Sequence, residues 1–137
     1  MRRTLTPADW RLLFAAAIAQ VVAAAGLRAM PLPALRASAS RCRRLAPLLV
    51  SGSDEHIIWA IEVTGRRLGR LSTCLIRALV AELLLDRKGG PTCLTIGVRR
   101  SGGRFEAHAW LAREGRVLIG APADEYLPLV HWNSPSA

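Results

Sequence analysis

The chain has 137 residues, enough for one domain with a buried core, and its 51% hydrophobic content excludes an intrinsically disordered protein. Nineteen Lys and Arg against ten Asp and Glu give a net charge of +9, which attracts nucleic acid, acidic peptides and anionic lipid alike. The three cysteines, Cys42, Cys74 and Cys93, show no CxxC spacing, which argues against a disulfide framework and a zinc site and favours a reducing, cytoplasmic compartment.

The first predicted element is an apolar helix. Thr6, Pro7 and Asp9 are typical of a helix start, with a hydroxyl N-cap, a proline at the first helical position and an acid that complements the macrodipole. We expect this helix to end near Ala25, before Gly26. A bilayer span needs roughly 20 apolar residues, so we expect no membrane span. The helix should be buried or face a partner, with a signal sequence or surface membrane helix as the alternative.

A basic segment follows. Pro31 and Pro33 favour a break, so we predict a linker with a short helix inside it. Residues 1–54 would form an N-terminal apolar helix and basic linker packed on a core of residues 55–137. The arginines of the linker are an ordinary solvated surface or a contact for an acidic partner; they are Arg36, Arg41, Arg43 and Arg44.

The second half predicts two helices and a small antiparallel sheet, an α+β fold. Apolar spacing favours a helix over 55–64, and a clearer one begins after Ser72 and Thr73. From Pro91 on, β-forming residues dominate, and they predict strands over 92–98, 105–112 and 116–120. Turns at residues 101–103 and 114–115 would join them into a meander. The tail from Asp124 is assigned no element.

Cys74 is the first candidate for chemistry. If Ser72 or Thr73 caps the helix, the thiol lies in its first turn, where free N–H groups and the macrodipole favour a thiolate. The same N–H groups could stabilise the oxyanion that forms when a thiolate attacks an amide. A small buried cysteine without a role in chemistry is the alternative.

His108 is the second candidate. Alternation along the strand places Glu106, His108 and Trp110 on one face. A helix followed by a meander can bring that face against the helix start, so the imidazole could act as the base for Cys74. A core histidine without a catalytic role is the alternative.

Three strings follow one another in a distinctive order and spacing. They are Cys74-Leu75-x-Arg77-Ala78, Gly-Pro-x-x-Leu-x-Ile-Gly-Val over 90–98, and Ala107-His108-Ala109-Trp110-Leu111. In this order the chain resembles the leader peptidases of lasso-peptide biosynthesis, the stand-alone protease form of the lasso maturation B protein. That family has a transglutaminase-like, papain-related fold. The resemblance covers residues 55–121 closely.

The resemblance implies a cysteine peptidase that removes the leader from a ribosomally made precursor, with Cys74 as nucleophile and His108 as base. The implied partners are the leader peptide, a small leader-recognition protein and the lasso cyclase. The apolar first helix and the basic segment over 36–44 are the expected docking surfaces. We expect no cofactor, no metal and no nucleic-acid partner.

The third member of the catalytic group departs from the family pattern. The family commonly has an Asp about twelve residues beyond the histidine, where this chain has Gly120. Asp124 is the nearest downstream acid and is our candidate for orienting His108. Glu106, the amide of Asn133 and a dyad without a third group are alternatives.

Two other functions stay open. The same Cys74–His108 pair could transfer the acyl group to an amine, as a transglutaminase-like fold permits. The +9 charge could instead belong to a non-enzymatic nucleic-acid-binding or adaptor protein, with salt-steep binding. The sequence has no aromatic-interleaved basic strand and no helix-turn-helix spacing to support it.

Overall fold

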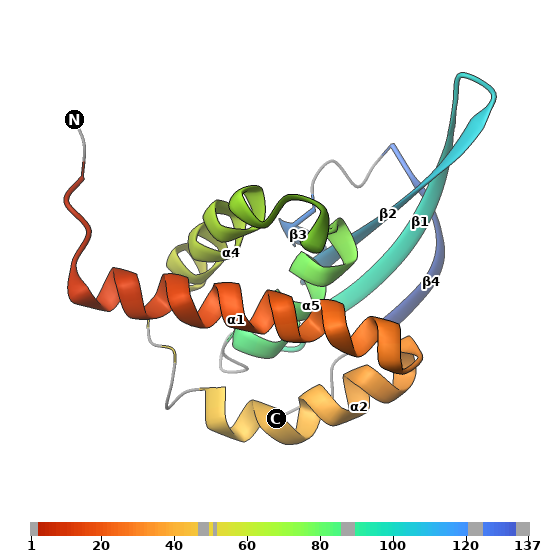
Figure 1. Ribbon diagram of the computed structural model, residues 1–137. Helices are drawn as coiled ribbons and strands as arrows, with labels where there is room; N and C mark the ends of the chain where they lie inside the picture. Colours follow the sequence, from red (N-terminus) through yellow and green to blue (C-terminus); the bar gives the residue numbers. More distant parts are fainter. Residues whose placement is uncertain (1–2, 47–49, 51, 86–89, 121–124, 134–137) are drawn as a thin grey trace.

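The computed structural model describes residues 3–46, 50, 52–85, 90–120 and 125–133 (Figure 1). The predicted α+β class is confirmed. In chain order the elements are α1 (Pro7–Ala29), α2 (Leu32–Cys42), the short 3-10 helix η1 (Arg43–Leu45), α4 (Asp54–Leu68), the 3-10 helix η2 (Gly69–Leu71), α5 (Cys74–Leu84), β1 (Cys93–Ser101), β2 (Arg104–Arg113), β3 (Arg116–Ile119) and β4 (Leu127–Asn133).

The strands form one antiparallel sheet in the order β3-β2-β1-β4. The predicted meander of β1, β2 and β3 is confirmed, and its second turn contains Glu114 and Gly115 at φ values of 52° and 78°. Helix α5 packs on β1, β2 and β3, while α1 and α4 pack on α5 and on each other. The helices thus form a layer on one side of the sheet, and the tip of the β1–β2 hairpin extends beyond them (Figure 1).

The predicted start of the first helix is confirmed. Thr6 caps α1 by accepting a hydrogen bond from the Asp9 backbone at 3.2 Å, and the Asp9 carboxylate accepts from the Thr6 backbone N–H at 2.8 Å. His56 of α4 donates to the same carboxylate at 2.7 Å. The Thr6 backbone N–H, then the Thr6 hydroxyl and His56, lower the pKa of Asp9.

The predicted end of this helix is wrong by four residues, since α1 runs through Gly26 to Ala29. Leu35 of α2 packs directly on Gly26, where a Cβ would lie 2.6 Å from Leu35 Cδ1. This glycine therefore allows close helix packing and does not end the helix.

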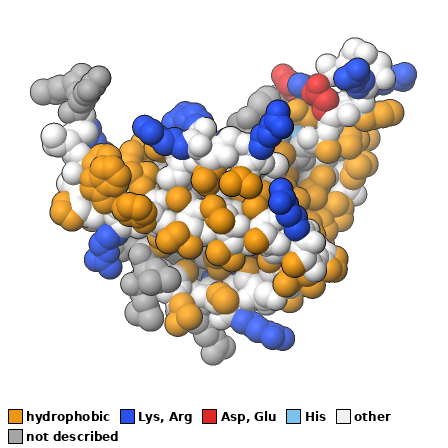
Figure 2. Space-filling view, in the orientation of Figure 1, with side chains coloured by type: hydrophobic (Ala, Val, Ile, Leu, Met, Phe, Trp, Pro, Cys, Tyr) orange, Lys and Arg blue, Asp and Glu red, His pale blue; other side chains and the backbone are white. Residues whose placement is uncertain are grey.

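The two faces of α1 are unusual. The inner face buries Asp9 and Gln20 together with leucines and alanines. The outer face exposes a stripe of large apolar side chains, which we call the outer face of α1: Trp10, Phe14, Ile18, Val21 and Val22. Figure 2 shows this apolar band along α1. By length and composition alone α1 could cross a membrane, and 28% of its most apolar stretch is buried in the protein.

The predicted basic linker is largely helical, as α2. Arg36 donates to Glu82 of α5 at 2.8 Å, and its guanidinium lies 5.5 Å from the centre of the Trp132 ring. The segment is held against the body of the protein by these contacts. Arg36 is therefore engaged within the molecule, whereas Arg41 is exposed.

The tail forms a strand that the sequence does not predict. β4 pairs with the free side of β1, and Pro128 lies opposite Gly97 at a shift in register. Proline has no N–H for a ladder hydrogen bond, and edge strands and bulges are where sheets accept it. The proline therefore makes the tail look unlike a strand in the sequence, although the tail forms an edge strand.

Candidate active site

Cys74 is the first residue of α5, as predicted. Thr73 is the N-cap, and its hydroxyl accepts a hydrogen bond from the Ile76 N–H at 3.3 Å. This cap leaves the N–H groups of the first turn near the half-buried Cys74 side chain. The thiol thus lies where a helix start favours negative charge.

His108 lies on β2 opposite Gly97 of β1. Its half-buried ring stacks on Trp110 and Tyr126, at centroid distances of 6.2 and 4.8 Å. A Cβ on Gly97 would lie 2.8 Å from Trp110 Cη2, so this glycine gives the indole its room. Two aromatic neighbours thereby restrict the imidazole.

Cys74 and His108 line one cleft of about 340 Å³ between the start of α5 and the sheet. The structure therefore brings together the two residues that the sequence singles out. The other lining residues are Glu62, Arg77, Leu118, Ile119 and Gly120.

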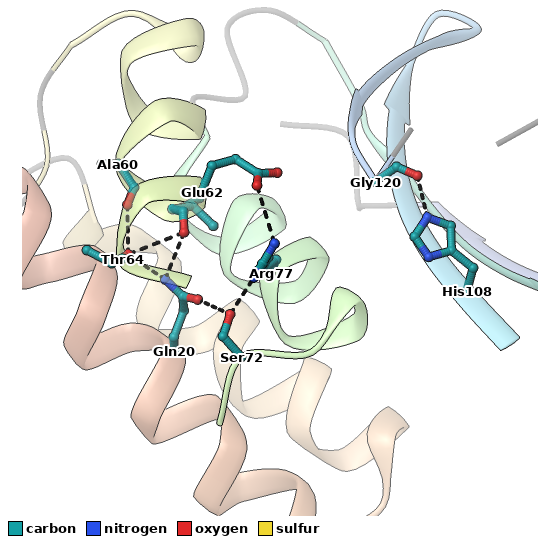
Figure 3. A network of polar contacts seen from close by, with 9 residues as sticks. Gln20, Ala60, Glu62, Thr64, Ser72, Arg77, His108 and Gly120 are labelled. Carbon is teal, nitrogen blue, oxygen red and sulfur yellow. Dashed lines mark hydrogen bonds and ion pairs between the residues drawn. The ribbon is translucent and has the colours of Figure 1, made fainter. Parts of the chain in front are cut away.

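The backbone carbonyl of Gly120 fixes the orientation of His108. The His108 Nε2 atom lies 2.5 Å from this oxygen, and Figure 3 shows the contact. A carbonyl only accepts hydrogen bonds, so Nε2 carries the proton in the neutral ring. The lone pair is then on Nδ1, which is the nitrogen left to take a proton from a nucleophile.

Position 120 requires glycine in this backbone. Gly120 has φ +93°, a conformation that side chains other than glycine rarely adopt. A Cβ there would lie 2.6 Å from the carbonyl oxygen of Ala109 and 2.9 Å from the Cα of Trp110. An Asp side chain begins with that same Cβ, so it does not fit this conformation.

The acids and amide considered for the third position are placed as follows. Asp124 lies outside the described residues. Glu106 accepts a hydrogen bond from Arg99 at 2.8 Å. Asn133 lies opposite Cys93 on β4 and lines a different cleft, about 300 Å³ in volume, between α2, α5 and β4.

Three residues near the site were not predicted: Arg77, Glu62 and Tyr126. Arg77 lies one turn after Cys74 and lines the cleft, and its Nη1 donates to Glu62 at 3.3 Å. The three-residue spacing from Cys74 is a signal that could have found Arg77. Tyr126 stacks on His108 just before the unpredicted strand β4, so no local pattern marked it.

The three cysteines are free thiols, with Cys42 exposed and Cys93 half-buried at the start of β1. Cys93 does not line the cleft that holds Cys74. Within the described parts of the chain, no group of three or more His, Cys, Asp and Glu side chains could hold a metal ion.

Comparison with known proteins agrees with this architecture. The family model described as the Transglutaminase-like superfamily matches residues 10–131, from α1 into β4. No curated protein and no solved structure matches the chain significantly. Cysteine peptidases and acyltransferases are common in that superfamily. With the match covering most of its length, the chain belongs to the transglutaminase-like superfamily.

Proposed function

We propose that this protein is a cysteine peptidase that removes the leader peptide from a ribosomally made lasso-peptide precursor. One observation carries the proposal. The thiol at the start of α5 and the imidazole on β2 line one cleft, and the Gly120 carbonyl holds Nε2 so that Nδ1 is free to act as base. This is the arrangement that nucleophilic catalysis requires, a nucleophile and a base with a third group orienting the base.

The reaction follows from these positions. His108 Nδ1 takes the thiol proton, and the Cys74 thiolate attacks the carbonyl carbon of the scissile amide. The N–H groups in the first turn of α5 stabilise the resulting oxyanion. His108 then gives its proton to the leaving amine, and the C–N bond breaks to leave a thioester. Water, deprotonated by His108, hydrolyses the thioester and restores the Cys74 thiol.

The choice of a leader peptide as substrate is supported by the position of the family-like strings. The string beginning at Cys74 forms the start of α5, and the string around His108 forms the middle of β2. Both line the cleft, so the resemblance is strongest where the chemistry would occur. The three free thiols suit a reducing compartment, and we propose a cytoplasmic site of action.

We also propose that a small leader-recognition protein docks on the outer face of α1. Exposed large apolar side chains that are contiguous, and not scattered singly, mark interaction sites. The charges exposed on α1, all of whose residues the structure describes, are those of Arg11 and Arg28, since its single acid, Asp9, is buried. The matching partner surface would be apolar with an acidic rim. Two copies of this chain, each at +9, would repel one another.

The decisive experiment is cleavage of a candidate lasso-peptide precursor, with and without a leader-recognition protein, followed by intact mass. We expect two fragments whose masses add up to the precursor plus one water. Cys74→Ala and His108→Ala should abolish cleavage, while Cys93→Ala, which changes a thiol outside the cleft, should retain it. Full cleavage by Cys74→Ala would disprove the proposed mechanism.

The same assay separates hydrolysis from acyl transfer. A hydrolase gives a free carboxylate at the new C-terminus, whereas an acyltransferase given an excess of a primary amine gives an amide of that amine. A product that carries only the amine would assign the Cys74–His108 pair to acyl transfer.

A further inference from the structure

The inner face of α1 carries a glutamine with no exposed surface. Gln20 Nε2 lies 2.7 Å from Thr64 Oγ1, 3.2 Å from the Ala16 carbonyl and 3.3 Å from the Ile61 carbonyl. Carbonyl oxygens only accept, so this side of the amide must be the nitrogen. The amide oxygen is therefore turned the other way, toward Ser72 (Figure 3).

Ser72 continues this contact toward the nucleophile. Its buried hydroxyl donates to Gln20 Oε1 at 2.5 Å and accepts from Arg77 Nε at 3.0 Å. Ser72 precedes Thr73, the N-cap of the helix that begins with Cys74. The hydroxyl therefore ties the backbone just before the thiol to α1 on one side and to Arg77 on the other.

Arg77 connects these hydrogen bonds to the cleft that holds Cys74. Its Nη1 donates to Glu62 of α4 at 3.3 Å, and both side chains line the cleft with Cys74 and His108. The guanidinium is thus fixed at two points, by Ser72 and by Glu62, one helical turn from the thiol. Its positive charge thus lies in the wall of the same cleft as the Cys74 thiol.

Gly65 of α4 makes room for these contacts. A Cβ at this position would lie 2.5 Å from Arg77 Nε and 2.8 Å from Ser72 Oγ. The guanidinium is the end of a flexible side chain that an added methyl group would displace, and the Ser72 hydroxyl would have to turn away as well. Position 65 therefore offers a way to break the Ser72–Arg77 contact selectively.

We propose that Gln20, Ser72 and Arg77 are positioning residues that hold the Cys74 thiol toward His108, which makes α1 a working part of the active site. The proposal rests on the proposed peptidase function for its kinetic readout. Its chemical readout, the reactivity of the Cys74 thiol, needs no substrate.

The main test is Gly65→Ala. Alanine has a higher helix propensity than glycine, which offsets part of the cost of displacing these contacts, and the Thr6→Ala control accounts for any remaining fall in the urea midpoint of unfolding. Displacement of Arg77 should lower kcat for precursor cleavage about tenfold to a hundredfold, because small misplacements of reacting groups cost this much, and KM should stay within about twofold. The rate of Cys74 alkylation by iodoacetamide, followed by mass spectrometry of its peptide, should fall about tenfold.

Two further variants complete the test. Gln20→Met keeps the length of the side chain but removes the link to Ser72, and it should lower kcat and the alkylation rate as Gly65→Ala does. Thr6→Ala is the matched control, because it weakens the other end of α1 without touching Gln20. It should lower the urea midpoint and leave kcat and the alkylation rate within about twofold of the unmodified protein.

The results separate the two proposals. Wild-type alkylation rates in both Gly65→Ala and Gln20→Met would overturn the positioning role, as would an equal fall in the Thr6→Ala control. If the unmodified protein cleaves no precursor, the peptidase function fails, and the alkylation rates alone still decide whether these residues position the thiol.

Discussion

Replacement of Gly120 by alanine is the sharpest test of how His108 is oriented. A residue other than glycine in a left-handed conformation such as φ +93° costs about 1–2 kcal/mol. The new methyl group would also lie 2.6 Å from the Ala109 carbonyl oxygen, a backbone atom that cannot rotate away. Overpacking of this kind costs about 1–3 kcal/mol. We expect Gly120→Ala to lower the free energy of unfolding by about 2–5 kcal/mol.

Gly115→Ala is the matched control for this substitution. Gly115 has φ +78°, but a Cβ there would have no atom within 4 Å, so only the conformational cost of about 1–2 kcal/mol applies. Urea unfolding of both variants should therefore show Gly120→Ala as the less stable protein. It should also cleave the precursor more slowly, because the carbonyl that holds His108 must shift, while Gly115→Ala keeps its kcat. Equal stability and equal kcat in the two variants would refute the argument.

Gly120→Asp tests two opposite expectations for catalysis, one from the sequence pattern of the lasso leader peptidases and one from the backbone geometry at Gly120. The pattern of the lasso leader peptidases suggests that an acid at this position would improve catalysis. The backbone geometry predicts the reverse, since the Asp would bring the same clash as alanine and displace the carbonyl. A higher kcat in Gly120→Asp than in the unmodified protein would show that a carboxylate, and not the backbone, belongs at the third position.

Three further predictions concern acid stability, the aromatic neighbour of His108 and the docking face. The pKa of Asp9 is lowered in the folded protein, so the Asp9 carboxylate stabilises the fold fully above its ordinary pKa of 3.8, and this stabilisation is lost as the pH falls through the folded pKa. Urea unfolding of Asp9→Asn should show a lower free energy of unfolding near neutral pH, and this free energy should fall less in acid than that of the unmodified protein. Tyr126→Ala should lower kcat about tenfold because His108 loses a stacked ring, while Tyr126→Phe keeps the ring and most of the activity. Equal kcat values in the two variants would contradict this role of the ring. Phe14→Ser combined with Ile18→Ser should raise KM for partner-dependent cleavage and leave cleavage without the partner unchanged, whereas the exposed Phe105→Ser should change neither.

The parts of the fold that the sequence predicts best depend on neighbours within a few residues. The caps at Thr6 and Thr73 each act on an N–H group three residues further along, so the residue types alone indicate both helix starts. The turn at Glu114 and Gly115 is local in the same sense. These short-range contacts place Cys74 in a first helical turn and His108 on a strand next to a tight hairpin.

The parts that the sequence misses depend on contacts between distant segments. Gly26 stays helical because Leu35 from the next helix packs on it, and the strand after Tyr126 exists because β1 has a free side to pair with. Gln20 gives no local sign of a role, since its partners Thr64 and Ser72 are more than forty residues away in the chain. Residue type cannot reveal contacts that only the fold creates.

The group that orients His108 shows most clearly why residue types alone miss such contacts. Position 120 has no acidic side chain, and the group that contacts His108 there is a backbone carbonyl, which every residue carries. What marks the position is the glycine itself at the end of β3, where a positive φ turns the carbonyl toward the imidazole and a Cβ would strike Ala109. A carbonyl oxygen can fix the Nε2–H tautomer as a carboxylate does, but without its full negative charge it stabilises the imidazolium less. A glycine at this position thus keeps the orientation of the imidazole but gives it less electrostatic support than an Asp would.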